Sequence, residues 1–166
     1  MNIFYLDKDA RLAAEAQCDK HVVKMILEMA QLLSTAHHVL DGEKAPQGIY
    51  KSTHKNHPSA IWVRSGVEQY RWTYDHFCFL LQEYYYRYGK IHATDRLREP
   101  LFRAPENISY EAPWSEPPTC IPDDCKIEGD VVGSYRKYYI NNKKDIATWK
   151  RREKPSWFIN TSEGTT

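Results

Sequence analysis

The chain has few of the features that mark a membrane, secreted or disulfide-linked protein. Its apolar runs fall short of the roughly 20 residues that a membrane-spanning helix requires. The N-terminal stretch MNIFYLDKD has no basic region and reaches an acid at Asp7, which is unlike a secretory signal. The four cysteines include no CxxC pair, which favours reduced thiols. We therefore expect a cytoplasmic protein with no membrane partner.

An excess of charge of one sign is also absent. The chain has 23 basic and 22 acidic side chains, a net charge of +1. A protein that holds duplex DNA through its phosphates usually has a clear basic excess. Basic residues are nevertheless concentrated in KKDIATWKRREK, residues 143–154. Two interpretations of this segment stay open: a solvated face, or a strip that binds phosphates.

Three stretches have the composition of long helices, with helix-forming or aromatic residues at three- and four-residue steps. They cover residues 9–38, 57–89 and 130–150. Gly66 falls inside the second stretch, where a glycine costs about 1 kcal/mol relative to Ala, so we expect close packing there. Only IFYL at 3–6 has some strand character.

Residues at the ends of these stretches match the preferences of helix termini. Asp9 is suited to cap the first helix and Gly42 to end it. His57 or Asn56, followed by a proline, is suited to begin the second helix, and Gly89 to end it.

The segment 99–130 holds six of the nine prolines, so it is neither regular helix nor central strand. Long segments of this kind often form a lid or wrap a site. The sequence thus predicts an all-α fold: a compact single domain of residues 1–158, with about three long helices and this Pro-rich segment as lid or wrap. Residues 159–166 are expected to be a frayed tail.

One side of the first predicted helix carries a line of polar residues. They are spaced three and four residues apart and therefore share a face: Gln17, His21, Lys24, Glu28, Gln31 and Thr35. Either this polar seam is the only solvated face of the helix, or it lines a cleft. In the second case Glu28 is an acid/base group, and His21 and Lys24 tune it. A single carboxylate among amides, one lysine and one histidine favours the cleft.

The second predicted helix adds further candidates. Asn56 and His57 lie at its N-terminus, where free N–H groups can receive a phosphate. Arg64 and Arg71 are seven residues apart and so share a face of a continuous helix. His54 and His57 match no metal signature, and we expect neither a metal nor a cofactor. The motifs of phosphate loops, serine hydrolases and zinc proteases are absent.

Short motifs along the chain resemble the pyrimidine-dimer DNA glycosylase family, the phage endonuclease V type. DKH at 19–21, with Glu28 seven residues after the histidine, is similar to the D-Q-H and catalytic Glu of that family. HKNHPSAIWV resembles the start of the family's second long helix. Lys150, seven positions before Trp157 in KPSWF, resembles the Lys that precedes the family's P-T-W-Y motif.

The resemblance implies an all-α enzyme that cleaves the N-glycosidic bond at UV photodimers and then the strand at the abasic site. Glu28 would stabilise the oxocarbenium-like sugar and move protons. The N-terminal amine would attack C1′ and form a Schiff base. Because Asn2 is large, Met removal is not expected, and that amine would belong to Met1. Leu27 and Gln31 stand where the family has arginines that contact phosphates.

We therefore predict a DNA N-glycosylase for damaged or modified pyrimidines, with or without lyase activity, located in the host cytoplasm if a phage encodes it. Its partner is DNA or a nucleotide ligand. In the alternative, the same fold binds or processes a nucleotide or modified base in a smaller pocket; a helical protein without such a pocket is the third possibility. The catalytic candidates are Glu28, Met1 and Asn2. The candidate substrate-binding residues are His21, Lys24, Gln31, Asn56, His57, Arg64, Arg71, Lys150 and Trp157.

Overall fold

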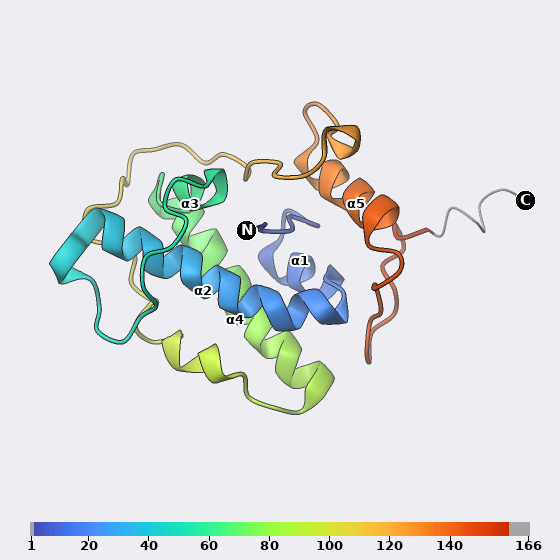
Figure 1. Ribbon diagram of the computed structural model, residues 1–166, viewed down its shortest axis with the longest axis horizontal. Coiled ribbons are helices and arrows are strands. Elements are labelled where there is room, and N and C mark those ends of the chain that lie inside the picture. The colour runs from blue at the N-terminus through green and yellow to red at the C-terminus, as the bar shows by residue number, and fades with distance from the viewer. Residues whose placement is uncertain (1, 160–166) are drawn as a thin grey trace, which may run out of the picture.

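The computed structural model describes residues 2–159, and this part of the chain contains five α-helices (Figure 1). Their bounds are α1 Ala10–Ala16, α2 Asp19–Asp41, α3 Pro58–Val63, α4 Val67–Tyr88 and α5 Val131–Asn142. Short 3-10 helices lie at Gly42–Lys44, Ala93–Leu97 and Asp123–Cys125. No β-strand occurs within residues 2–159, and the all-α prediction is confirmed. Met1 and residues 160–166, most of the predicted tail, lie outside the described residues.

The core lies where α4 packs against α1 and α2, with α2 crossing in front of α4 in Figure 1. Val22, Ile26, Met29 and Leu33 are fully buried along α2, at steps of four, three and four residues. This spacing turns one apolar side of the helix toward the core. Among the described residues, no helix is both long enough and apolar enough to cross a membrane.

The helix ends follow the local signals of the sequence. The Asp9 carboxylate accepts hydrogen bonds from two backbone N–H groups of the first turn of α1. His57 caps α3, and its Nδ1 accepts from a backbone N–H two residues on. Gly42 and Gly89 end α2 and α4 with φ of 56° and 67°, a region that glycine enters without strain.

Two of the predicted long helices are interrupted. The first breaks at Gln17 and Cys18, which are extended. There the Tyr139 hydroxyl and the Thr148 carbonyl accept hydrogen bonds from the backbone N–H groups of Cys18 and the next residue. Such bonds from distant parts of the chain replace those that a continuous helix would make.

The second break falls at Gly66, which caps α4 instead of lying inside a helix. A Cβ at this position would lie 3.1 Å from Ala112 Cβ and 2.6 Å from Gln69 Oε1. The expectation of close packing at Gly66 is therefore confirmed, although the packing marks a break in the helix. The third predicted helix ends at Asn142 and not near residue 150.

The segment 3–6 is buried but is not a strand. The Pro-rich segment 99–130 contains no α-helix. Several of its backbone carbonyls accept hydrogen bonds from side chains of α3, α4 and α5, including the indole of Trp62, the amide of Gln69 and the hydroxyl of Tyr135. That this segment acts as a lid over a ligand stays a prediction.

Buried charges tie the C-terminal segment to the helices. Arg87 is 1% exposed, and its guanidinium donates to Glu83 at 2.8 Å and to Asp19 at 3.1 Å. Arg152 donates two more hydrogen bonds to the Glu83 carboxylate. Burial alone would raise the pKa of Glu83, but the hydrogen bonds from Arg152 and Arg87 outweigh it and lower the pKa. Arg87, Glu83, Asp19 and Arg152 are called the charge cluster below.

Candidate functional site

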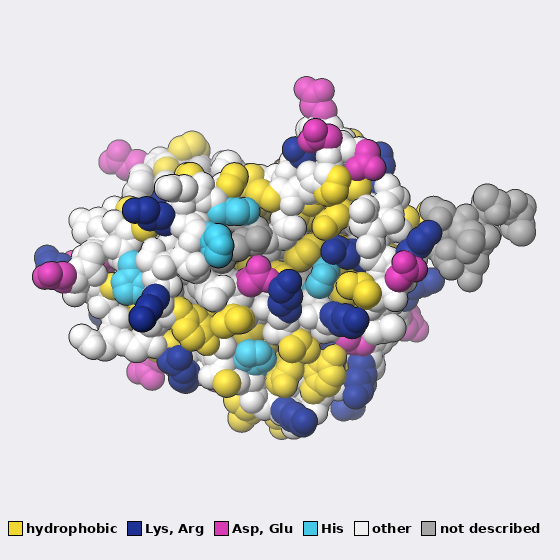
Figure 2. Space-filling model, viewed as in Figure 1, with side chains coloured by type: hydrophobic (Ala, Val, Ile, Leu, Met, Phe, Trp, Pro, Cys, Tyr) yellow, Lys and Arg dark blue, Asp and Glu magenta, His cyan; other side chains and the backbone are white. Residues whose placement is uncertain are grey.

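The polar seam of α2 starts beside the N-terminal segment, residues 2–8. Phe4 of this segment stacks on His21, with ring centroids 4.2 Å apart. Its φ of 54° is unusual for a residue with a large side chain, and strain of this kind is often found near functional sites. Figure 2 shows one face of the molecule on which histidine, acidic and basic side chains lie close together.

His21 is held in one orientation. Its Nδ1 lies 2.6 Å from the Tyr139 hydroxyl, which also accepts a hydrogen bond from the backbone N–H of Cys18 and lies 3.7 Å from the Cys18 Sγ. Burial lowers the pKa of His21 to about 4, with the charges of Lys143 and Lys24 as smaller causes. The imidazole is therefore neutral at pH 7. Its Nδ1 is used by Tyr139, which leaves Nε2 for a further partner.

Trp157, from the C-terminal segment, joins this group. Its ring centroid lies 6.0 Å from that of Tyr139, and the Arg136 guanidinium lies over the indole at 5.3 Å. The structure thus brings two predicted site residues, His21 and Trp157, into contact with the same tyrosine. Phe4, His21, Tyr139 and Trp157 are called the imidazole cluster below.

Glu28 lies two turns further along α2 than His21, about 10 Å along the helix axis. Its side chain is half-buried and its Oε2 is buried. Lys24, between the two, is exposed, and Gln31 on the next turn is half-buried. Glu28 is therefore flanked along the seam by a cation on one side and an amide on the other.

The two ends of the seam have structural roles. The Gln17 amide donates to Nε2 of His76, which is fully buried and whose Nδ1 donates to a backbone carbonyl of α1. The Thr35 hydroxyl bonds both the backbone N–H and the carbonyl of Thr53. Gln17, His21 and Thr35 are buried, so the seam as a whole is not a solvated face.

The candidates near the start of α3 are less enclosed. His57 is half-buried and its pKa is lowered, mainly by burial, while Asn56 is exposed. Asn2 is half-buried, and its Oδ1 is buried without a hydrogen-bond partner among the described residues. Met1, the predicted source of the nucleophilic amine, lies outside the described residues.

The predicted pair of arginines does not share a helix face. Arg64 ends α3, and Arg71 lies in α4 beyond the break, so the inference from their seven-residue spacing is wrong. Burial lowers the pKa of Arg64, whose Nη1 has no hydrogen-bond partner within residues 2–159. Arg71 is exposed and lines a separate cavity.

Lys150, in the C-terminal segment, contacts the first turn of α2. Its backbone N–H donates to both carboxylate oxygens of Asp19, and its ammonium lies 5.1 Å from the centre of the Tyr88 ring. Other cations of the segment 143–154 also lie over tyrosine rings, as Arg151 and Arg152 do at Tyr86. The basic segment is thus ordered on aromatic side chains.

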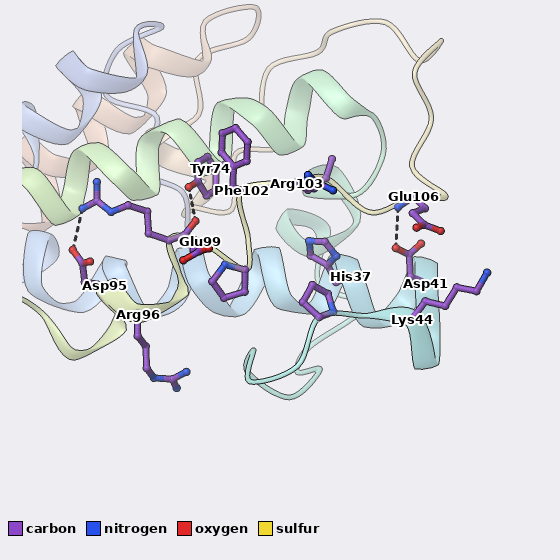
Figure 3. Close-up of a pocket in the computed structure, with 14 residues that line it drawn as sticks. His37, Asp41, Lys44, Tyr74, Asp95, Arg96, Glu99, Phe102, Arg103 and Glu106 are labelled. Carbon is purple, nitrogen blue, oxygen red and sulfur yellow. Dashed lines mark hydrogen bonds and ion pairs between the residues drawn. The ribbon is translucent and has the colours of Figure 1, made fainter.

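A cavity of about 1040 Å³ lies elsewhere, between the end of α2 and the segment 93–106 (Figure 3). None of the predicted site residues lines it. Some of its charges are used within the protein: Asp41 accepts from the backbone of Glu106, and Arg98 pairs with Asp95 at 2.9 Å. We therefore place the candidate site at the seam and not in this larger cavity.

Within residues 2–159, no group of three or more His, Cys, Asp or Glu side chains is arranged to hold a metal ion. The four cysteines are free. Sequence reasoning missed Phe4 and Tyr139, the two residues that fix His21. No local signal separates Tyr139 from the other eleven tyrosines, because its partners are more than a hundred residues away in the sequence.

Comparison of the chain with models of protein families, with curated proteins and with solved structures gives no match.

Proposed function

We propose that the chain is a DNA N-glycosylase that acts on damaged or modified pyrimidines and uses Glu28 as its acid/base group. The observation that carries the proposal is the setting of Glu28. It is a half-buried carboxylate with one buried oxygen, two turns along α2 from a neutral imidazole. Together with a neutral hydrogen-bonding group such as His21, a carboxylate of this kind suits cleavage of a glycosidic bond.

The Glu28 carboxylate would act at two points of the reaction. As the C1′–N bond breaks, its electron pair leaves with the base, and the carboxylate stabilises the positive charge that develops on the sugar. Water then adds to C1′ and gives a proton to Glu28, which passes it to the released base. The target nucleotide must first leave the base stack, which is least costly at a damaged base.

The other seam residues would position the substrate. Nε2 of His21 is suited to a hydrogen bond with a polar group at the edge of the pyrimidine. The exposed ammonium of Lys24 is suited to a phosphate. A lyase step would need the amine of Met1, which makes strand cleavage a separate part of the proposal.

A nicking assay tests the proposal directly. Wild type is expected to release bases from UV-irradiated duplex, seen as strand breaks after alkali, whereas Glu28→Gln lowers the rate by at least about 100-fold. Glu43→Gln, at an exposed carboxylate beyond the end of α2, is the matched control and leaves the rate unchanged. If folded wild type leaves irradiated duplex intact, the glycosylase proposal is wrong.

Strand breaks without alkali, and a covalent adduct trapped by borohydride, would identify the lyase step. Intact-mass measurement shows whether Met1 is retained. Trapping at a Lys side chain, and not at the N-terminal residue, would contradict the role of the amine.

A smaller ligand is the second candidate, and the positions next to Glu28 favour it. Leu27 is 40% exposed and apolar, and Gln31 is neutral, where arginines would contact phosphates of a duplex. In this case a nucleotide or modified base raises the melting temperature, and Glu28→Gln or His21→Ala removes the shift. A screen of nucleotides with no shift would exclude this candidate.

A further inference from the structure

A cavity of about 770 Å³ lies where the N-terminal segment meets α4 and the Pro-rich segment. Its walls include three aromatic rings and three carboxylates that the proposed function does not use: Tyr5, Trp72, Trp114, Glu68, Asp75 and Glu116. Tyr5 follows Phe4 directly in the chain, so the N-terminal segment contributes one ring to the imidazole cluster and the next ring to this cavity.

The rings of this cavity are held in place before any ligand binds. Trp62, 6% exposed, contacts Trp114 at 5.7 Å and Trp72 at 6.4 Å between ring centroids. Tyr5 lies 5.1 Å from Trp72. The indole N–H groups of Trp62 and Trp72 donate to backbone carbonyls of the Pro-rich and N-terminal segments. The polar edges are therefore occupied, and the rings are fixed at angles to one another.

The two carboxylates next to the rings are unequally buried. Glu116 is half-buried, with Oε2 buried and without a hydrogen-bond partner among the described residues, whereas Asp75 is exposed. Burial and then the charge of Glu116 raise the pKa of Tyr5. Burial also raises the pKa of Asp75, which the charge of Arg71 partly offsets. A buried carboxylate oxygen such as Oε2 of Glu116 is stabilised by a cation.

The cations nearest to this cavity do not occupy the rings. Lys8 and Arg71 line it, but the cation–π contacts found among residues 2–159 are made on other rings. Trp114 is 40% exposed, so part of this ring is open to a ligand.

We propose that this cavity binds a small organic ammonium ion, with Tyr5, Trp72 and Trp114 around the nitrogen and Glu116 and Asp75 as counter-charges. Aromatic rings attract alkylammonium groups through their negative faces, and nearby carboxylates add to this attraction. An anion would meet three carboxylates, with only Lys8 and Arg71 as cations. Among the described residues, no group of three or more His, Cys, Asp or Glu side chains is arranged to hold a metal ion. The site is independent of the proposed glycosylase activity.

Titration with choline and with putrescine tests the site, followed by tryptophan fluorescence at constant ionic strength. Saturable binding of either is expected. Tighter binding of choline identifies a site for quaternary ammonium, and tighter binding of putrescine one for primary amines. The carbon analogue of choline, in which an uncharged carbon replaces the nitrogen, is expected not to bind. Equal binding of this analogue, or no saturable response to either amine, would overturn the proposal.

Variants locate the binding. Trp114→Ala and Glu116→Gln are each expected to weaken binding about tenfold, because one removes a ring and the other a counter-charge. Phe102→Ala is the control, since Phe102 is an exposed aromatic residue outside the cavity. Unchanged affinity in both folded variants would show that the ammonium binds elsewhere and would also overturn the proposal.

Discussion

Asp19 and His21 are two residues apart on α2, yet they belong to buried clusters of opposite kinds. In the charge cluster the buried groups stay ionised, because Arg87 and Arg152 surround the Glu83 carboxylate with hydrogen bonds. In the imidazole cluster the buried group is neutral, because burial lowers the pKa of His21 to about 4.

The charge cluster has a structural role, whereas the imidazole cluster is suited to bind a ligand. A buried charge that is fully paired is costly to disturb and has little capacity left for a ligand. A neutral imidazole held by one tyrosine keeps its second ring nitrogen for a further partner. On this basis, Asp19 has a structural role, whereas His21 and Glu28 carry the candidate chemistry.

The largest expected effect comes from opening the charge cluster. Arg87→Ala leaves the buried Glu83 and the adjacent Asp19 without their shared partner, and is expected to lower the free energy of unfolding by about 3–5 kcal/mol. Urea denaturation measures the change. Arg87→Lys, which keeps the charge but loses the fork of donors, should fall between wild type and Ala. A loss below about 1 kcal/mol in Arg87→Ala would contradict the structural role.

Acid is expected to disturb the imidazole cluster before the charge cluster. The pKa values of His21 and His76 are about 4 in the folded protein and about 6.5 when unfolded. Between these values the unfolded chain binds more protons, so stability falls as pH falls from about 6.5 to about 4, by about 3 kcal/mol for each histidine. Over the same range the lowered pKa of Glu83 keeps that carboxylate ionised.

Urea denaturation near pH 7 and near pH 5 tests this pH dependence. His76→Gln keeps a donor and an acceptor but cannot titrate, so its loss of stability between the two pH values should be smaller than that of wild type. Equal stability of wild type at both pH values would show that the two histidines are not buried in neutral form.

Removing one hydroxyl should loosen the imidazole cluster without unfolding the protein. Tyr139→Phe leaves His21 Nδ1 and the backbone N–H of Cys18 without their partner and is expected to cost about 1–3 kcal/mol. Tyr110→Phe, at a residue that is 64% exposed, is the control. Thermal unfolding of both variants measures the difference; equal melting temperatures would contradict the proposed hydrogen bonds.

The smallest effect is expected at the edge of the charge cluster. Arg11 pairs with Glu15 at 3.7 Å, with 61% of the Arg11 side chain exposed. Arg11→Ala should change the free energy of unfolding by no more than about 0.5 kcal/mol. A larger loss would extend the charge cluster to the surface of α1.

Local signals in the sequence were enough to predict helix ends but not helix interruptions. Asp9, Gly42 and Gly89 act within one turn, and all three were predicted correctly. The break at Cys18 depends on Tyr139 and on the segment near residue 148, which no local pattern contains. The same limit explains why Arg64 and Arg71 were wrongly assigned to one helix face.

The candidate site was predictable in part for the same reason. The seam follows from helical spacing, and His21 and Glu28 do lie on one side of α2. The partners of His21 could not be predicted, because Phe4 reaches it through an unusual φ and Tyr139 from the far end of the chain. Asp19 belongs to the DKH motif, but its partner Arg87 is 68 residues away, in a different helix.

The partners of Asp19 also determine when its hydrogen bonds can form during synthesis of the protein. Its carboxylate accepts hydrogen bonds from the Thr148 hydroxyl and the Lys150 backbone, and Trp149 donates to a carbonyl at the end of α1. A chain still on the ribosome cannot make these bonds until residue 150 has left the exit tunnel. The start of α2 is therefore fixed only after residues up to 150 have been translated.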